Sequence, residues 1–222
     1  MAILRFPDPR ESTPEGIVAL GGDLEPESLL LAYRSGLFPW PIDGLPLAWF
    51  CPPERAILEF SQIHIPRSLK KAIRTGQFRL TLNRAFQQVI LACADAPRPG
   101  QEGTWITPEM VRAYSRFHEL GHAHSVEVWQ DQTLMGGIYG VLVNGIFSAE
   151  SMFHRAPNAS KIALLHLVES LQAQGLTWMD IQVMTPHMEK LGAKVISRDD
   201  FLARLRRSSA SENAFGARDP NP

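Results

Sequence analysis

The dipeptide Asn144-Gly145 lies between two apolar runs and constrains the fold more than any other feature of the chain. Asn-Gly at such a junction is typical of a two-residue β-hairpin turn. It predicts strands over residues 134–143 and 146–151. An alternating run over residues 123–130, followed by a turn at Asp131-Gln132, predicts another strand before them. The middle of the chain is therefore expected to form an antiparallel meander.

Capping and periodicity signals surround this meander. They predict helices over residues 26–35, 66–75, 83–94 with Asn83 as N-cap, 107–120, 158–174, 186–191 and 199–207, and strands over 177–183 and 193–197. The order strand, strand, strand, helix, strand resembles the acyltransferase fold called GNAT. We expect an α+β protein with a small N-terminal α/β domain (1–55) followed by a GNAT-like domain (56–207) around a mostly antiparallel central sheet. Residues 208–222 are small and polar, and we expect a disordered tail there.

Composition excludes several classes of protein. The net charge of −1 gives no global mark of a nucleic-acid binder, and Cys51 and Cys93 form no disulfide framework. No apolar run reaches the roughly 20 residues of a membrane span, and no signal peptide opens the chain. His118, His122 and His124 lack the partners that would complete a zinc site, so no metal is predicted. These features predict a cytoplasmic protein with no membrane partner.

Glu150 is the first candidate site residue. It stands at the end of an apolar run, just before an expected helix start. An ionised side chain is costly in apolar surroundings unless it has a partner. The pattern therefore predicts a site that recognises a cation.

Asp180 and Gln182 form a second candidate pair on the strand predicted over 177–183. A period of two places them on the same face. There the carboxylate can attract an amine, and the amide can donate a hydrogen bond to an acyl oxygen. The alternative is the exposed polar face of an edge strand. The apolar neighbours Trp178 and Met179 favour a central, buried strand.

A basic stripe and two tryptophans complete the candidates. Arg67, Lys71 and Arg74, with a fourth cation at Lys70, share one face of the helix predicted over 66–75. Such a stripe is either a solvated face or a contact surface for phosphates. Trp40 and Trp105 lie beside a stiff proline loop and a helix start, and each is either core packing or a stacking platform for a base.

Together these segments resemble the leucyl/phenylalanyl-tRNA–protein transferase family. The resemblance covers about residues 6–205. It rests on Gly21-Gly22-Asp23-Leu24, Leu30 to Tyr33, Gly36-Leu37-Phe38-Pro39-Trp40, Gly103-Thr104-Trp105-Ile106-Thr107, His118 to Ser125, Gly136-Gly137-Ile138-Tyr139-Gly140, Glu150-Ser151-Met152-Phe153, Asn158-Ala159-Ser160-Lys161 and Asp180-Ile181-Gln182-Val183.

The resemblance implies transfer of Leu or Phe, and less readily Met, from aminoacyl-tRNA to proteins whose N-terminal residue is Arg or Lys. This marks them for degradation by the bacterial N-end rule pathway. It implies no cofactor, and we expect a monomer. It assigns the amine-handling step to Asp180 and Gln182, and the tRNA's terminal adenosine to Trp40 and Trp105. Glu150 would pair with the acceptor's basic side chain.

The resemblance also assigns tRNA backbone contacts and an aminoacyl pocket. Arg67, Lys71 and Arg74 match the basic patch for the acceptor stem. The pocket walls are Ile138, Phe147, Leu164, Leu167, Leu171 and Met179. The family often has larger aromatics where Leu167 and Leu171 stand, and such a change is worth about 1–3 kcal/mol in an apolar pocket.

Two other functions stay open at this point. One is an acetyl-CoA-dependent N-acetyltransferase of the same fold, which is disfavoured because Arg155-Ala156-Pro157-Asn158 stands where a glycine-rich phosphate turn is expected. The other is a non-catalytic tRNA-binding module. The preferred amino acid, and whether Asp180 is a base or an anchor, are not decided by the sequence.

Overall fold

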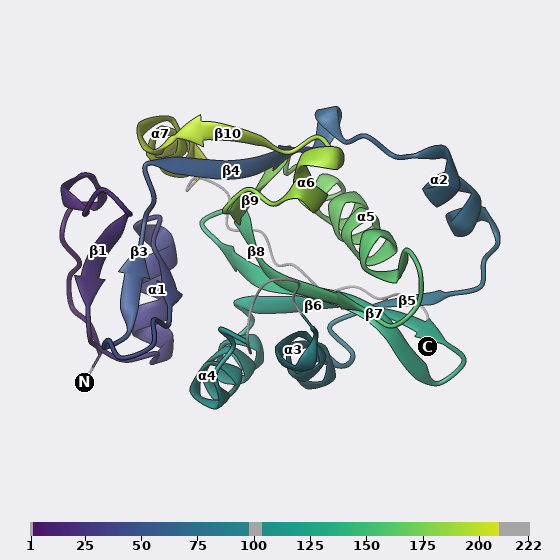
Figure 1. Ribbon diagram of the computed structural model, residues 1–222, viewed down its shortest axis with the longest axis horizontal. Coiled ribbons are helices and arrows are strands. Elements are labelled where there is room, and N and C mark those ends of the chain that lie inside the picture. The colour runs from purple at the N-terminus through teal and green to yellow at the C-terminus, as the bar shows by residue number, and fades with distance from the viewer. Residues whose placement is uncertain (1, 98–103, 209–222) are drawn as a thin grey trace.

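A computed structural model describes residues 2–97 and 104–208 of the 222-residue chain. Its main element is a seven-stranded sheet in the order β10-β4-β9-β8-β7-β6-β5 (Figure 1). Neighbouring strands are antiparallel except β8 and β9, which are parallel. The strands are β4 (Glu54–Glu59), β5 (Arg79–Leu82), β6 (Ala123–Gln130), β7 (Thr133–Val143), β8 (Ile146–His154), β9 (Trp178–Gln182) and β10 (Lys194–Ser197).

Helices cover both faces of this sheet. The crossover helix α5 packs on one face, whereas α3 and α4 pack on the other (Figure 1). Helix α2 contacts α5, and α7 contacts β4 and β10. The helices are α1 (Pro26–Arg34), α2 (Arg67–Arg74), α3 (Phe86–Asp95), α4 (Pro108–Glu119), α5 (Ala159–Gln172), α6 (Pro186–Lys190) and α7 (Arg198–Ser208). The fold is α+β, with a small N-terminal part and a main part built on a mixed, mostly antiparallel sheet.

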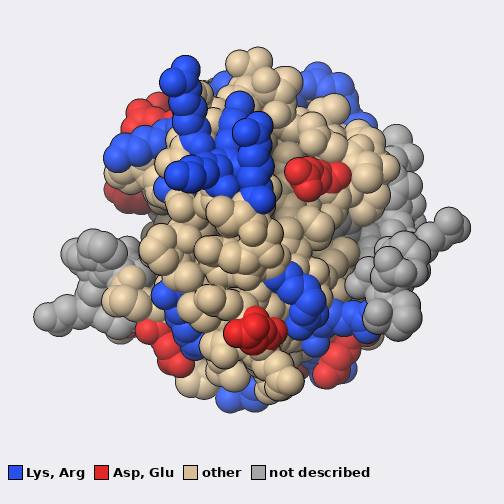
Figure 2. Space-filling view, turned by 90° about the vertical axis from the view of Figure 1, so that its right-hand side faces the viewer, with Lys and Arg blue, Asp and Glu red and all other residues tan. Residues whose placement is uncertain are grey.

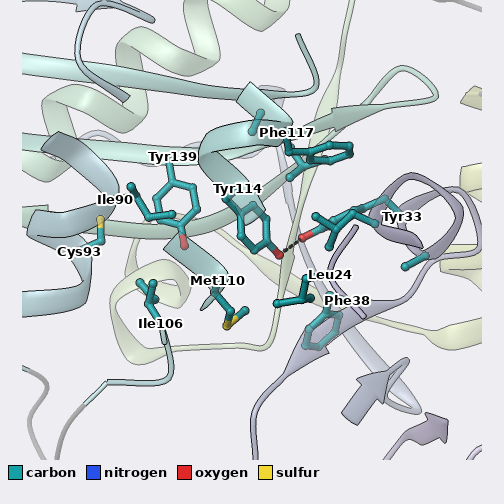
Figure 3. Packing of buried hydrophobic residues seen from close by; sticks show 14 of the residues in the cluster. Leu24, Tyr33, Phe38, Ile90, Cys93, Ile106, Met110, Tyr114, Phe117 and Tyr139 are labelled. Atoms are coloured by element: carbon teal, nitrogen blue, oxygen red, sulfur yellow. Dashed lines mark hydrogen bonds between the residues drawn. The ribbon is translucent and has the colours of Figure 1, made fainter. Parts of the chain in front are cut away.

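The N-terminal part forms a second, three-stranded sheet in the order β1-β3-β2. It consists of β1 (Ile17–Leu20), β2 (Phe38–Trp40) and β3 (Ala48–Phe50), with α1 beside it (Figure 1). One buried cluster joins this part to α3, α4 and β7. Figure 3 shows Leu24, Tyr33 and Phe38 from the N-terminal part facing Tyr114 and Phe117 of α4. The small sheet is therefore fixed against the main sheet by a shared core.

Local signals explain several element boundaries. Asn144 and Gly145 both have positive φ (53° and 68°), as a type I′ hairpin turn requires. The Thr107 side chain accepts a hydrogen bond from the Met110 backbone N–H and caps α4. The predicted meander, the crossover helix and the central position of β9 are confirmed.

Other boundary predictions were wrong. Asn83 does not cap α3, because that helix begins at Phe86 and Asn83 instead has φ 59° and bonds to the Ser125 backbone. No helix starts just after Glu150, since β8 continues to His154. Ser208 belongs to α7, and the rest of the predicted tail, residues 209–222, lies outside the described residues.

The N-terminal strands and β4 were not predicted. The domain boundary expected between residues 55 and 56 falls inside β4, and the division into domains stays a prediction. None of the helices in the described ranges has the length and apolar character needed to cross a bilayer.

Candidate active site

The candidate site lies where the parallel strands β8 and β9 meet at the centre of the main sheet. Their register pairs Ser148 with Asp180. Asp180 and Gln182 occupy the end of β9, and Glu150 lies on β8, two residues after Ser148. The sheet thus brings together the three residues that the sequence singled out for acceptor chemistry.

A β-bulge determines the position of Glu150. On the β7 side, Tyr139 pairs with Ser151 and Gly140 pairs with Ala149, so Glu150 is the extra residue. Bulges redirect a side chain and are common beside active sites. Gly140 is required opposite the bulge, since a Cβ there would collide with the Ser148 carbonyl oxygen.

Gln182 terminates β9 in a strained turn. It has φ 61°, and the Val183 backbone N–H donates to the Ile181 carbonyl at 2.7 Å. This is the rare form of γ-turn with positive φ. A non-glycine residue held there costs about 1–3 kcal/mol, and such strain persists only when its surroundings enforce it. The Asp180 carboxylate contributes here by accepting the Gln182 backbone N–H at 2.9 Å.

Asp180 itself is fully buried at 0% exposure. Arg55 of β4 donates to both of its oxygens, at 2.8 and 2.7 Å, and Ser148 donates to one of them at 3.1 Å. Arg55 thus occupies both oxygens of the carboxylate, and Asp180 also contacts Gln182. A direct contact between Asp180 and an incoming amine stays a prediction.

Glu150 is half-buried and accepts hydrogen bonds from Tyr33 at 2.8 Å and from the Gln182 side-chain amide at 2.7 Å. The Tyr114 hydroxyl bonds to Tyr33, as the dashed line in Figure 3 shows. Burial raises the pKa of Glu150 to about 7, with a further contribution from the charge of Asp180. Burial, and then the charge of Glu150, raise the pKa of both tyrosines well above the usual value. Both hydroxyls therefore remain protonated donors.

The hydrogen bonds fix the orientation of the Gln182 amide. Its nitrogen donates to Glu150, and no described residue engages its oxygen. The oxygen is therefore available as an acceptor for an N–H group. This differs from the expected role, in which Gln182 donates to an acyl oxygen. Glu150 and Gln182 together present two acceptors to a basic, amine-bearing ligand.

Trp40 and Trp105 lie against each other. Their ring centroids are 5.0 Å apart with an interplanar angle of 16°, and both rings are half-buried. The structure thus brings the two predicted base-stacking residues into one aromatic pair. One comes from the small sheet, and the other from the segment before α4.

The six predicted pocket residues also lie together. They belong to one buried cluster between the main sheet and α5, and each is at most 3% exposed. They form close-packed core in this structure. Their role as walls of an aminoacyl pocket stays a prediction. The six are Ile138, Phe147, Leu164, Leu167, Leu171 and Met179.

The predicted basic residues Arg67, Lys71 and Arg74 lie exposed on α2, while Leu69 on the same helix is buried. Figure 2, which views the end of the molecule that carries α2, shows a dense cluster of Lys and Arg side chains in its upper part, with acidic side chains only at the margins of this cluster. Other Lys and Arg side chains lie below it, next to acidic ones. The first turn of α2 contains no acidic residue. This surface is suited to phosphate contacts.

Comparison with known proteins identifies the family. The protein-family model described as leucyl/phenylalanyl-tRNA protein transferase matches residues 57–206. The family model of its N-terminal domain matches residues 22–53. The chain belongs to the leucyl/phenylalanyl-tRNA–protein transferase family.

Similar members of this transferase family come from several bacteria. The leucyl/phenylalanyl-tRNA–protein transferase of Anaeromyxobacter sp. (strain K) is 49% identical over 203 residues, which cover 91% of this chain and 87% of the relative. The transferase of Oleidesulfovibrio alaskensis is 49% identical over 210 residues, which cover 92% of this chain and 85% of the relative. Among solved structures, L-PGS from Bacillus licheniformis has a TM-score of 0.40 at 16% identity, covering 73% of this chain and 52% of its own.

Sequence reasoning missed Arg55, Tyr33 and Tyr114. Tyr33 lies within the motif Leu30 to Tyr33 that supports the transferase resemblance, but nothing local links it to Glu150, 117 residues away. Arg55 precedes the apolar run Ala56, Ile57 and Leu58, a pattern that indicates a buried strand. A basic residue at the start of such a strand was the available signal.

Proposed function

We propose that the protein transfers Leu or Phe, and less readily Met, from aminoacyl-tRNA to the α-amino group of proteins that begin with Arg or Lys. Leucyl/phenylalanyl transfer from tRNA to protein is the activity named for its close relatives. The observation that carries the proposal is the fixed amide of Gln182, whose oxygen is open to an N–H donor beside the carboxylate of Glu150.

The reaction needs an oriented amine more than a protein nucleophile. The neutral α-amine attacks the ester carbonyl, the C–N bond forms, the C–O bond to the terminal ribose breaks, and the released hydroxyl takes up the proton. An aminoacyl ester is already activated, so proximity and orientation can supply much of the acceleration. Gln182 accepts one amine N–H and thereby directs the nitrogen lone pair toward the ester. Asp180 acts as the anchor that maintains this geometry.

Glu150 recognises the basic side chain at the acceptor's N-terminus. A half-buried carboxylate with a raised pKa gains a favourable partner when a cation arrives. The cation favours the ionised form, so binding of the acceptor is coupled to loss of a proton from Glu150. Because Glu150 also bonds to Gln182, the side chain and the amine of the acceptor are read by adjoining groups.

The donor would be held by α2 and the tryptophan pair. Contacts from Arg67, Lys71 and Arg74 to the tRNA backbone supply affinity with little sequence information. Trp40 and Trp105 provide a stacking surface for the terminal adenosine. The aminoacyl side chain enters the apolar layer between the sheet and α5. No cofactor takes part. We place the reaction in the cytoplasm, and we propose a monomer.

The transfer assay tests this function. Leucyl-tRNA with labelled leucine is incubated with a peptide that begins with Arg, and with a matched peptide that begins with Ala. Label is expected in the first peptide only. The Gln182→Met variant should lose about 100-fold in rate, within the range for one positioned polar group, yet still bind tRNA. Gln132→Met, at an exposed turn, is the matched control and should transfer normally.

The outcomes separate the alternatives. Transfer of label from acetyl-CoA, with none from leucyl-tRNA, would instead support an N-acetyltransferase. Tight tRNA binding with no transfer by the unmodified protein would support a non-catalytic binding module.

A further inference from the structure

Arg55 is a fully enclosed cation beside the candidate site. It lies on β4, next to β9, and is 1% exposed. Its guanidinium carbon lies 4.7 Å from the ring centre of Phe38 and 4.3 Å from that of Phe201, and one nitrogen donates to the Gly36 carbonyl at 3.2 Å. A planar group enclosed in this way has one orientation. The small sheet and α7 both contribute to its enclosure.

One oxygen atom connects Arg55 to the strained turn at Gln182. Oδ1 of Asp180 accepts both the Nε–H of Arg55, at 2.8 Å, and the backbone N–H of Gln182, at 2.9 Å. Oδ2 accepts the second arm of the guanidinium at 2.7 Å. The bidentate pair therefore sets the position of the atom that holds Gln182 in its left-handed conformation. That conformation in turn directs the Gln182 amide to Glu150.

We propose that Arg55 is a positioning residue for aminoacyl transfer. It acts through Asp180 to hold the turn at Gln182, and so orients the amide oxygen that receives the acceptor's amine. Arg55 is buried, and it affects the rate without touching either substrate. This inference rests on the proposed function, and it adds to it a residue outside the group that meets the amine.

The alternative is an ordinary core ion pair. Buried ion pairs are weak contributors to stability, and apolar replacements are often neutral, so stability alone does not account for a buried arginine with this geometry. The two readings predict different couplings. A positioning residue lowers kcat of the folded protein and loses this effect once Asp180 no longer holds the turn, whereas a core ion pair changes the free energy of unfolding and leaves kcat of the folded protein unchanged.

A double-mutant cycle measures this coupling in the transfer assay. Arg55→Gln alone should lower kcat about 100-fold, the scale of a misplaced reacting group, with little change in KM for leucyl-tRNA. Asp180→Asn alone should lower kcat similarly. Adding Arg55→Gln to the D180N protein should change kcat by no more than about twofold. A change of that size lies within the scatter of such measurements and therefore counts as no further effect. An equal, multiplicative loss in both backgrounds would overturn the proposal.

Further variants keep the double-mutant cycle interpretable if one variant does not fold. The D180N protein lacks the carboxylate that pairs with Arg55, so Arg55→Gln leaves no unpaired partner there. Arg55→Lys retains the charge but lacks the two-pronged donor geometry, and it should lower kcat as well. Thermal melting of each variant identifies those that fold. If Arg55→Gln does not fold alone, the same cycle is run with Arg55→Lys.

A second readout does not depend on activity, and it separates this inference from the proposed function. In a crystal structure of Arg55→Lys, Gln182 should leave positive φ and its amide should lose contact with Glu150. An unchanged Gln182 would refute the inference, even if the unmodified protein transfers leucine. Arg204→Gln is the control: Arg204 pairs with Glu59 at the far end of β4, and its loss should leave both kcat and Gln182 unchanged.

Discussion

At the scale of single residues, Glu150 lies at a β-bulge and is surrounded by polar side chains. Tyr33 and Gln182 donate to the same carboxylate oxygen, and burial raises its pKa to about 7. The hydrogen bonds favour the ionised form but do not offset burial. Glu150 therefore changes charge near neutral pH.

Acceptor binding should consequently strengthen as the pH rises. An N-acetylated peptide that begins with Arg keeps its charged side chain but has no titrating α-amine. Because a cation prefers ionised Glu150, its affinity should increase about tenfold from pH 6 to pH 8, as the ionised fraction rises through a pKa of about 7. Isothermal titration calorimetry gives the affinity. Glu150→Gln should bind weakly at every pH, and a matched peptide that begins with Gln should show no pH dependence. A parallel rise in the variant would assign the titration to another group.

The sequence predicted that Glu150, Asp180 and Gln182 belong together, but not how. A period of two places Asp180 and Gln182 on one face, yet the γ-turn at Gln182 breaks that regularity. The partner of Asp180 lies 125 residues away, on a strand whose neighbours are chosen by sheet topology. Local periodicity carries no information on such a contact.

At the scale of elements, α2 is an amphipathic helix held by Leu69 with its cations exposed. Changing Arg67, Lys71 and Arg74 together to Gln should weaken tRNA binding. Fewer counterions are then released on binding. The negative slope of the logarithm of the binding constant against the logarithm of the salt concentration should therefore become shallower by about 2–3. Filter binding at several salt concentrations measures the slope, and circular dichroism checks that the fold is intact.

A control variant separates local contacts from net charge. Changing Arg5, Arg112 and Arg116, which are exposed elsewhere, to Gln removes the same charge. It should leave the slope nearly unchanged. Equal effects from the two triple variants would show that α2 is not the tRNA contact.

Elements with strong local signals were predictable, and those defined by partners were not. The Asn144-Gly145 hairpin and the Thr107 cap specify their own geometry. By contrast, β2 and β3 are three-residue strands that exist only through pairing. Asn83 illustrates a different failure, because its side chain meets a neighbouring strand instead of a helix N-terminus.

At the scale of the whole molecule, the site is a joint product of both sheets. Tyr33 and Trp40 come from the N-terminal part, and Gly36 and Phe38 of that part hold Arg55. The buried cluster of Figure 3 continues from α1 through α4 to β7. The small sheet therefore supports the geometry of the large one, and the two parts should lose structure together.

This predicts cooperative destabilisation by a change in the N-terminal core. Leu29 on α1 is 0% exposed, and Leu29→Ala should cost about 2–5 kcal/mol, as for other buried leucines. Native-state hydrogen exchange shows which strands lose stability. Amides of β7 should lose protection by the same free energy as those of β3, since both strands border the shared cluster. Leu91→Ala, at a 45% exposed position on α3, should have little effect. Loss confined to β1, β2 and β3 would show that the N-terminal part unfolds independently, and the support it gives to Arg55 would then be separable from the fold of the main sheet.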